Sequence, residues 1–173
     1  MNPRPRAASE GGPFPRLLET LRPDLLRFAF WLARDRAVAE DVVQETLIRA
    51  WKSKDELKDP AAARPWLLTI VRREHARLYE RKRLPTVDVD SIEALEDPAL
   101  AIDGDAGLAD LRGAILKLPD EYREPLVLQV LGGFSTSEIA KELNLTQAAV
   151  LTRLFRARNR LRTIYGLTPA EEE

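Results

Sequence analysis

Residues 86–110 form the segment that most limits how this chain can fold. They include no Lys or Arg, while their acidic residues are Asp88, Asp90, Glu93, Glu96, Asp97, Asp103, Asp105 and Asp110. Pro98, Gly104 and Gly107 further oppose a continuous helix or strand there. A run of one charge that proline and glycine interrupt predicts a linker, and this linker divides the chain into two parts.

Hydrophobic periodicity on both sides of the linker is helical. From 17 to 83 and again from 111 to 165, apolar residues recur at intervals of three and four, and the alternation typical of strands is absent. We therefore predict an all-α fold with two small helical domains joined by an acidic linker. The predicted parts are a flexible tail (1–14), a first domain (15–85), the linker (86–107), a second domain (108–166) and a short tail (167–173).

Composition argues against several functional classes. The chain has no cysteine, which excludes disulfides and thiolate nucleophiles, and one histidine, which excludes a triad that needs a second imidazole. We expect no metal ion, no cofactor and no catalytic activity. No apolar run approaches the roughly 20 residues of a membrane helix, and the N-terminus lacks the apolar centre of a signal peptide. We therefore expect a cytoplasmic protein without membrane insertion.

The formal net charge of -1 conceals two basic helices. Residues 64–83 contain seven basic and two acidic residues, and residues 146–165 contain five arginines and no acid. Either helix alone is also compatible with an ordinary solvated surface. Two of them, separated by an acidic segment, indicate two contacts with a polyanion, for which nucleic acid is the leading candidate.

The start of the second basic helix has the pattern of a helix-turn-helix. Ser135 and Glu138 fit a capping box, Asn144 fits the left-handed residue that ends a helix, and Thr146 fits the N-cap of the next one. A short helix, a tight turn and a longer arginine-bearing helix are typical of this DNA-binding motif. The motif predicts DNA binding, but it does not say what is regulated.

A helical wheel assigns two faces to that longer helix. The stripe expected to face the core contains Val150, Leu154, Ala157, Leu161 and Ile164. The opposite face contains Ala148, Thr152, Phe155, Arg156 and Asn159. An exposed Phe155 on a basic helix either contacts base edges in a groove or packs against the other domain or a partner chain.

In the first domain, residues 39–51 predict a helix with an apolar face that includes Trp51 and a polar face. The polar face contains Asp41, Gln44, Glu45, Ile48 and Lys52. An acidic-amide surface around an isoleucine fits a protein-docking surface, with a solvated face as the alternative.

Two aromatic side chains occur on the first basic helix. Trp66 is either a stacking platform for an unpaired base or a core residue. His75 has no partner at metal-ligand spacing, so we expect it on the helix surface, facing a phosphate.

Four blocks, in order, carry a resemblance to a known family. Ala39–Trp51, Pro65–Arg72, Leu118–Arg123 and Ser137–Arg158 resemble the bacterial RNA polymerase sigma factors of the sigma-70 family, in particular the extracytoplasmic-function (ECF) group. The resemblance covers about residues 15–166. It implies a region 2 domain and a region 4 domain that bind core RNA polymerase and direct promoter recognition and transcription initiation. It also implies control by an anti-sigma factor.

The resemblance also implies roles for individual residues. The expected contacts with core polymerase are Asp41, Gln44, Glu45 and Ile48. The expected contacts with the −10 element, read as single-stranded DNA, are Arg64, Trp66, Arg72, Arg73 and Arg77. The expected contacts with the −35 element, read as duplex, are Thr146, Thr152, Arg153, Phe155, Arg156 and Arg160.

One departure from the family pattern bears on DNA reading. The family commonly has Gly-Thr-Val and then a basic residue where this chain has Ala148-Ala149-Val150-Leu151, so one phosphate or base contact is lost. The alternative function is a stand-alone helix-turn-helix repressor or activator with a helical dimerisation domain. The polar face of residues 41–52 argues against it, because a dimer core should be more apolar.

Overall fold

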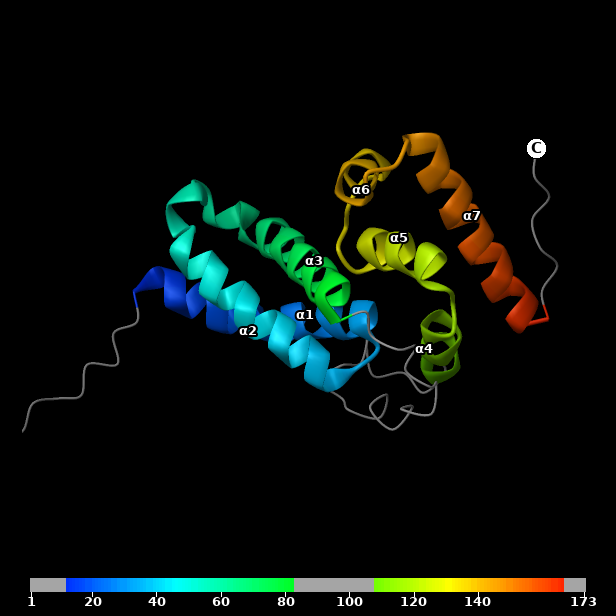
Figure 1. Cartoon of the computed structure of the whole chain (residues 1–173), viewed down its shortest axis with the longest axis horizontal. Helices are drawn as coiled ribbons and strands as arrows, with labels where there is room; N and C mark the ends of the chain where they lie inside the picture. The colour runs from blue at the N-terminus through cyan, green and yellow to red at the C-terminus, as the bar shows by residue number, and fades with distance from the viewer. Residues whose placement is uncertain (1–11, 83–107, 167–173) are drawn as a thin grey trace, which may run out of the picture.

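The computed structural model describes residues 12–82 and 108–166, which fold into helices and connecting turns without a strand (Figure 1). The elements are α1 (Pro13–Ala33), α2 (Arg36–Lys52), η1 (Lys54–Glu56), η2 (Pro60–Ala62), α3 (Ala63–Lys82), α4 (Leu108–Leu116), α5 (Asp120–Val130), α6 (Thr136–Leu143) and α7 (Gln147–Ile164). The all-α prediction is confirmed. The predicted linker at 86–107 and the tail at 167–173 lie outside the described residues.

Helices α1, α2 and α3 pack together as the N-terminal bundle. Arg34 ends α1 in the left-handed conformation (φ 58°) and donates its backbone N–H to the Phe30 carbonyl. Asp35 then caps α2, because its side chain accepts a hydrogen bond from the Val38 N–H at 3.0 Å. These local signals set the tight turn between α1 and α2.

The first helix begins earlier than the sequence predicts. Pro13 and Phe14, placed in the flexible tail, belong to α1. Proline is favourable in a first helical turn because its φ is already fixed and its missing N–H has no intrahelical partner to lose. The Phe14 ring also contacts the ring of Trp51, with 5.9 Å between centroids, and this contact ties the start of α1 to the end of α2.

Helices α4 to α7 form the C-terminal bundle, and its predicted caps are confirmed. Ser135 Oγ accepts from the Glu138 N–H at 3.2 Å, while the Glu138 carboxylate accepts from the Ser135 N–H at 2.7 Å. The hydrogen bonds that the Glu138 carboxylate accepts from the Ser135 N–H and from the Ser135 hydroxyl lower the pKa of Glu138. Asn144 is left-handed (φ 53°), and Thr146 accepts from the Ala149 N–H at 3.1 Å. The cap residues therefore set where α6 begins and ends and where α7 begins.

The predicted core stripe of α7 is correct for most of its length. Val150, Leu154 and Ala157 are buried, and Leu161 packs at the edge of the core. Ile164 is 55% exposed, so its prediction as a core residue was wrong. The periodicity continues to Ile164, but the apolar side chains packed against α7 do not reach its last turn.

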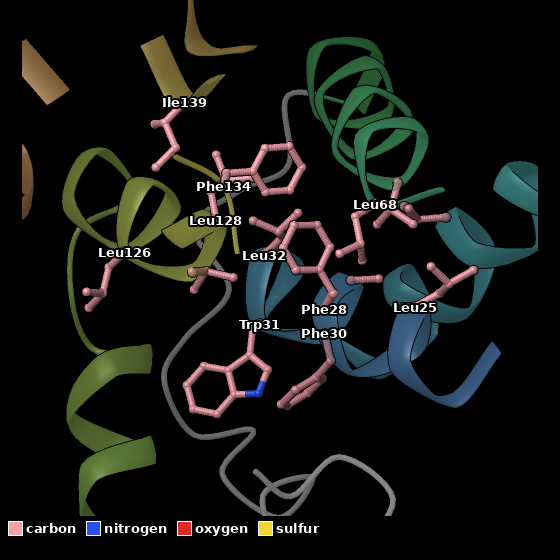
Figure 2. Close-up of a cluster of buried hydrophobic side chains, with 14 of the residues drawn as sticks. Leu25, Phe28, Phe30, Trp31, Leu32, Leu68, Leu126, Leu128, Phe134 and Ile139 are labelled. Atoms are coloured by element: carbon pink, nitrogen blue, oxygen red, sulfur yellow. The ribbon is translucent and has the colours of Figure 1, made fainter. Parts of the chain in front are cut away.

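The two bundles pack against each other, with α5 against α1 (Figure 1). One continuous hydrophobic cluster includes Phe28 and Leu32 of α1, Leu68 of α3, and Leu128 and Phe134 of the C-terminal bundle (Figure 2). The structure is thus a closed arrangement, in which the bundles share a core. Within the described ranges, no helix has both the length and the apolar character needed to cross a bilayer.

The Gly132-Gly133 turn places Phe134 in this shared core. The Phe134 N–H returns to the Leu128 carbonyl at 3.1 Å, and Gly133 has a φ of 71°, which favours glycine. A Cβ at Gly132 would lie 2.5 Å from the Phe134 ring and 2.6 Å from the Leu128 carbonyl oxygen. The path of the chain back across the end of α5 therefore requires glycine at 132.

We expect Gly132→Ala to lower the free energy of unfolding by about 1–3 kcal/mol, because Phe134 must move out of the shared core. Urea denaturation monitored by circular dichroism measures this loss. Gly113→Ala is the matched control: a Cβ there meets nothing within 4 Å, and alanine favours α4, so it should stabilise by up to about 1 kcal/mol. Equal effects of the two substitutions would contradict the packing role of Gly132.

Candidate protein and nucleic-acid interfaces

The polar face of α2 is exposed along its length. Asp41, Gln44, Glu45 and Ile48 lie at helical spacing on one side, and all four are exposed, Ile48 by 42%. The structure therefore brings together the four residues predicted to bind core polymerase.

Trp51 extends this surface, contrary to its prediction as part of the apolar face. Its side chain is 50% exposed, its ring contacts Phe14, and the Lys54 ammonium lies 5.2 Å above it. The end of α2 has too few neighbours to cover a tryptophan. Ile48 and Trp51 thus add apolar area to the acidic surface of α2, a composition typical of protein interfaces.

The exposed side of α7 carries most of the residues predicted to read duplex DNA. Thr152 and Arg156 are exposed, and Thr146 caps the N-terminus. Phe155 is half-buried rather than exposed, so less of its ring is available than the helical wheel indicates. Arg153 is also half-buried.

Two further arginines of α7 have partners within the C-terminal bundle. The Arg160 guanidinium lies 4.6 Å from the centroid of the Tyr122 ring, a cation–π contact with α5. Arg158 donates to the Gln129 side chain at 2.6 Å. These contacts orient two exposed charges, and the α7 surface remains basic.

On α3, three of the five residues predicted to contact the −10 element face the C-terminal bundle instead. Arg64 donates to the Leu131 carbonyl at 2.7 Å and pairs with Asp24 at 2.6 Å. Arg72 and Arg73 pair with Glu142 at 3.7 and 3.0 Å. In this arrangement, carboxylates and carbonyls of the protein accept from the arginines that the sequence predicts at the −10 element.

The other two residues predicted at the −10 surface differ from these. Trp66 is half-buried and packs against the core, which favours the core interpretation over an exposed stacking platform. Arg77 lies 3.5 Å from Glu74, a buried carboxylate that also pairs with Arg49 of α2. Arg77 therefore stabilises the N-terminal bundle as well as contributing charge to α3.

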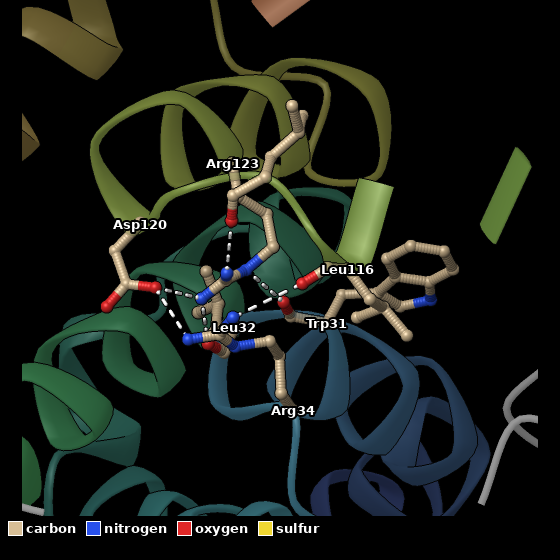
Figure 3. Close-up of polar contacts among 7 residues, drawn as sticks. Trp31, Leu32, Arg34, Leu116, Asp120 and Arg123 are labelled. Carbon is tan, nitrogen blue, oxygen red and sulfur yellow. Dashed lines mark hydrogen bonds and ion pairs between the residues drawn. The ribbon is translucent and has the colours of Figure 1, made fainter. Parts of the chain in front are cut away.

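A reciprocal pair of arginines joins the bundles, and sequence reasoning did not foresee it (Figure 3). Arg123 of α5 is 3% exposed and donates to the Trp31 and Leu32 carbonyls at the end of α1, both at 3.3 Å. Arg34, just after α1, donates to the Leu116 carbonyl at the end of α4 at 3.2 Å. We call this pair the arginine exchange.

Asp120 links the two halves of the arginine exchange. Its carboxylate accepts from Arg123 at 2.6 Å and from Arg34 at 3.1 Å (Figure 3). Carbonyls at the end of a helix lack intrahelical donors, and the helix dipole favours a cation there. Each arginine thus donates to a helix end in the opposite bundle, and the Asp120 carboxylate lies between the two guanidinium groups and offsets part of their repulsion.

His75 lies beside this site rather than facing solvent as predicted. It is half-buried, and burial together with Arg123 lowers its pKa to about 4, while Asp120 opposes the shift and Arg72 adds to it. Burial and Arg34 likewise lower the pKa of Arg123, against the effect of Asp120. Among the described residues, no group of three or more His, Cys, Asp or Glu side chains is placed to hold a metal ion.

Comparisons with known proteins match both bundles. The family model "Sigma-70 region 2" matches residues 17–84, and "Sigma-70, region 4" matches residues 108–161. The chain is 31% identical to the ECF RNA polymerase sigma factor SigM of Bacillus subtilis over 149 residues, which cover 83% of this chain and 89% of SigM.

Two solved structures are similar over most of the chain. The sigma factor RpoE of Bartonella quintana, in complex with the anti-sigma factor NepR, aligns with a TM-score of 0.64 and 30% identity, covering 88% of this chain and 96% of RpoE. CnrH, in complex with the cytosolic domain of CnrY, aligns with a TM-score of 0.58 and 27% identity, covering 88% of this chain and 87% of CnrH.

We expect Arg123→Gln to open the closed arrangement. The substitution removes a charged donor from the α1 carbonyls and from Asp120, which should destabilise the contact between bundles by roughly 2–4 kcal/mol. Small-angle X-ray scattering should show a larger radius of gyration. Arg158→Gln is the control, because Arg158 donates to Gln129 within one bundle. A wild-type radius for Arg123→Gln would contradict the role of the arginine exchange.

Acid should also open the closed arrangement through His75. Its pKa is about 4 when the bundles are closed and should return toward 6.5 when they part, so the open form binds the extra proton. Protonation of His75 does not affect the equilibrium between closed and open forms well above pH 6.5. Near pH 5.5 it raises the equilibrium constant for opening by up to about tenfold. Distance measurement between fluorophores on the two bundles tests this, and His75→Gln should abolish the dependence because the chain has one histidine.

Proposed function

Because the chain belongs to the ECF group of the sigma-70 family of RNA polymerase sigma factors, we propose that it is the promoter-specificity subunit of a bacterial RNA polymerase. The observation that carries this proposal is the presence, in one chain, of both regions: an acidic exposed α2 face in the first and a capped helix-turn-helix in the second. It acts by binding and positioning, without catalysis of its own, in the cytoplasm where promoter DNA is transcribed.

We assign region 2 to residues 15–85 and region 4 to residues 108–166. In region 2, the exposed α2 face with Asp41, Gln44, Glu45 and Ile48 docks on core polymerase. The arginines of α3 contact the −10 element, and α7 enters the major groove of the −35 element with Thr152 and Arg156 on its exposed side.

The closed arrangement must open for both DNA surfaces to act. Arg64, Arg72 and Arg73 are engaged by region 4, so −10 contact requires that region 4 leave α3. Core polymerase supplies the free energy for this separation by binding the two regions at separate places. The free protein should then bind promoter DNA weakly, because its region 2 donors are already satisfied.

An anti-sigma factor is the expected regulator. The structural relatives RpoE and CnrH were both solved with a bound partner, described for RpoE as the anti-sigma factor NepR. A partner of this kind on the present chain would act by keeping the α2 face from core polymerase. The alternative, a stand-alone helix-turn-helix regulator that dimerises through the first bundle, is disfavoured because the exposed α2 face is largely polar.

We expect wild-type protein to co-elute with core RNA polymerase in gel filtration and Asp41→Arg/Glu45→Arg to elute alone, because two charge reversals remove the acidic docking surface. The control is Glu19→Arg/Glu121→Arg, which makes the same change of net charge at two exposed acids away from α2. If wild type fails to co-elute and Arg123→Gln also fails, the protein is not a polymerase subunit. If Arg123→Gln co-elutes and wild type does not, the closed arrangement is what prevents wild type from binding core polymerase.

A further inference from the structure

An exposed leucine stands on the DNA-facing side of α7 without a role in folding. Leu151 lies in the second turn of the helix and is 53% exposed. Ala148 and Phe155, three residues before it and four after it, lie on the same side of the helix. Together they make an apolar strip along the first half of α7.

The polar groups around this strip already have partners within the protein. The Gln147 amide nitrogen donates to Thr136 Oγ1 at 2.9 Å, and the Thr152 hydroxyl donates to the Ala148 carbonyl at 3.0 Å. Thr146 Oγ1 caps the helix through the Ala149 N–H. Around Leu151, the Thr146 and Thr152 hydroxyls and the Gln147 amide are therefore engaged within the protein, and the strip itself offers methyl, alkyl and ring groups.

Major-groove chemistry identifies what such a strip can recognise. In helix-turn-helix proteins the N-terminal residues of the second helix contact base edges. Of the groups on those edges, the 5-methyl of thymine is the apolar one, whereas guanine, adenine and cytosine present hydrogen-bonding atoms that a leucine cannot satisfy. The arginines that flank the strip, with no acid on α7, supply the phosphate contacts that hold the helix in the groove.

We propose that Leu151 determines promoter specificity by packing on the 5-methyl group of a thymine in the −35 element. The inference rests on the proposed function and deepens it. Reading is thereby divided on α7: Leu151 in the apolar strip recognises thymine, and Arg156, five residues later, recognises a hydrogen-bonding edge.

The test uses holoenzyme reconstituted from the full chain and core RNA polymerase. Duplexes with a randomised −35 element are selected for binding, and each thymine of the selected element is then replaced by deoxyuridine, which removes the methyl group alone. At one position we expect about fourfold weaker binding, the size expected for one buried methyl group. Leu151→Ala should bind the thymine and uracil duplexes alike, and Leu151→Lys should do so with a steeper salt dependence.

Two variants separate the proposal from its premise. Ile164→Ala removes a comparably exposed apolar side chain (55%) from the other side of α7 and should keep the methyl effect. Arg156→Ala should weaken binding to the selected −35 element by the same factor in its thymine and uracil forms, and so should keep the methyl effect. Equal binding of thymine and uracil duplexes by wild type, or a full methyl effect in Leu151→Ala, overturns the assignment of Leu151. If wild type binds all −35 sequences equally and Arg156→Ala changes nothing, the −35 function itself is overturned.

Discussion

The closed arrangement depends on the buried guanidinium of Arg123, which needs hydrogen-bond acceptors and an opposite charge. Moving a charged group out of water costs several kcal/mol unless hydrogen bonds and an opposite charge compensate for it. Arg123 obtains both, since carbonyls at the end of α1 and its own Leu118 carbonyl accept from it, and Asp120 balances its charge. The requirement fixes where α5 meets α1, and the shared hydrophobic core forms around that alignment.

In the proposed function, the arginines of α3 have two alternative partners, region 4 and the −10 element, and they cannot bind both at once. In the closed arrangement Arg72 is 18% exposed and lies between Glu124 and Glu142, an environment that resembles a phosphate backbone in charge. If these arginines contact the −10 element as proposed, nucleic acid and region 4 compete for one set of donors. In the proposed function, the outcome depends on the combined binding free energy of polymerase and DNA, because each surface ion pair contributes little alone.

Local features were predictable from the sequence, whereas contacts between distant segments were not. The capping box at Ser135 and Glu138, the left-handed Asn144 and the Thr146 cap depend on residues at most four apart, and all were confirmed. Ile164 and Trp51 were assigned to apolar faces by periodicity, which cannot tell where the neighbouring helices end. Arg123 was noticed within the Leu118–Arg123 block, but the two acceptors that join it to the other bundle lie in α1, and no pattern in the chain points to them.

The arginine exchange has a consequence for how this protein can diverge. Arg123 and Arg34 bind main-chain oxygens of Trp31, Leu32 and Leu116, which any residue at those positions would provide. A change of side chain at an acceptor position therefore requires no matching change at Arg123 or Arg34. This part of the contact should leave no covariation signal, although the two bundles depend on it. Side chains at the acceptor positions are free to change as far as this contact is concerned. An insertion or deletion that rotates the end of α1 is not tolerated, because it would turn the carbonyls away from their donors.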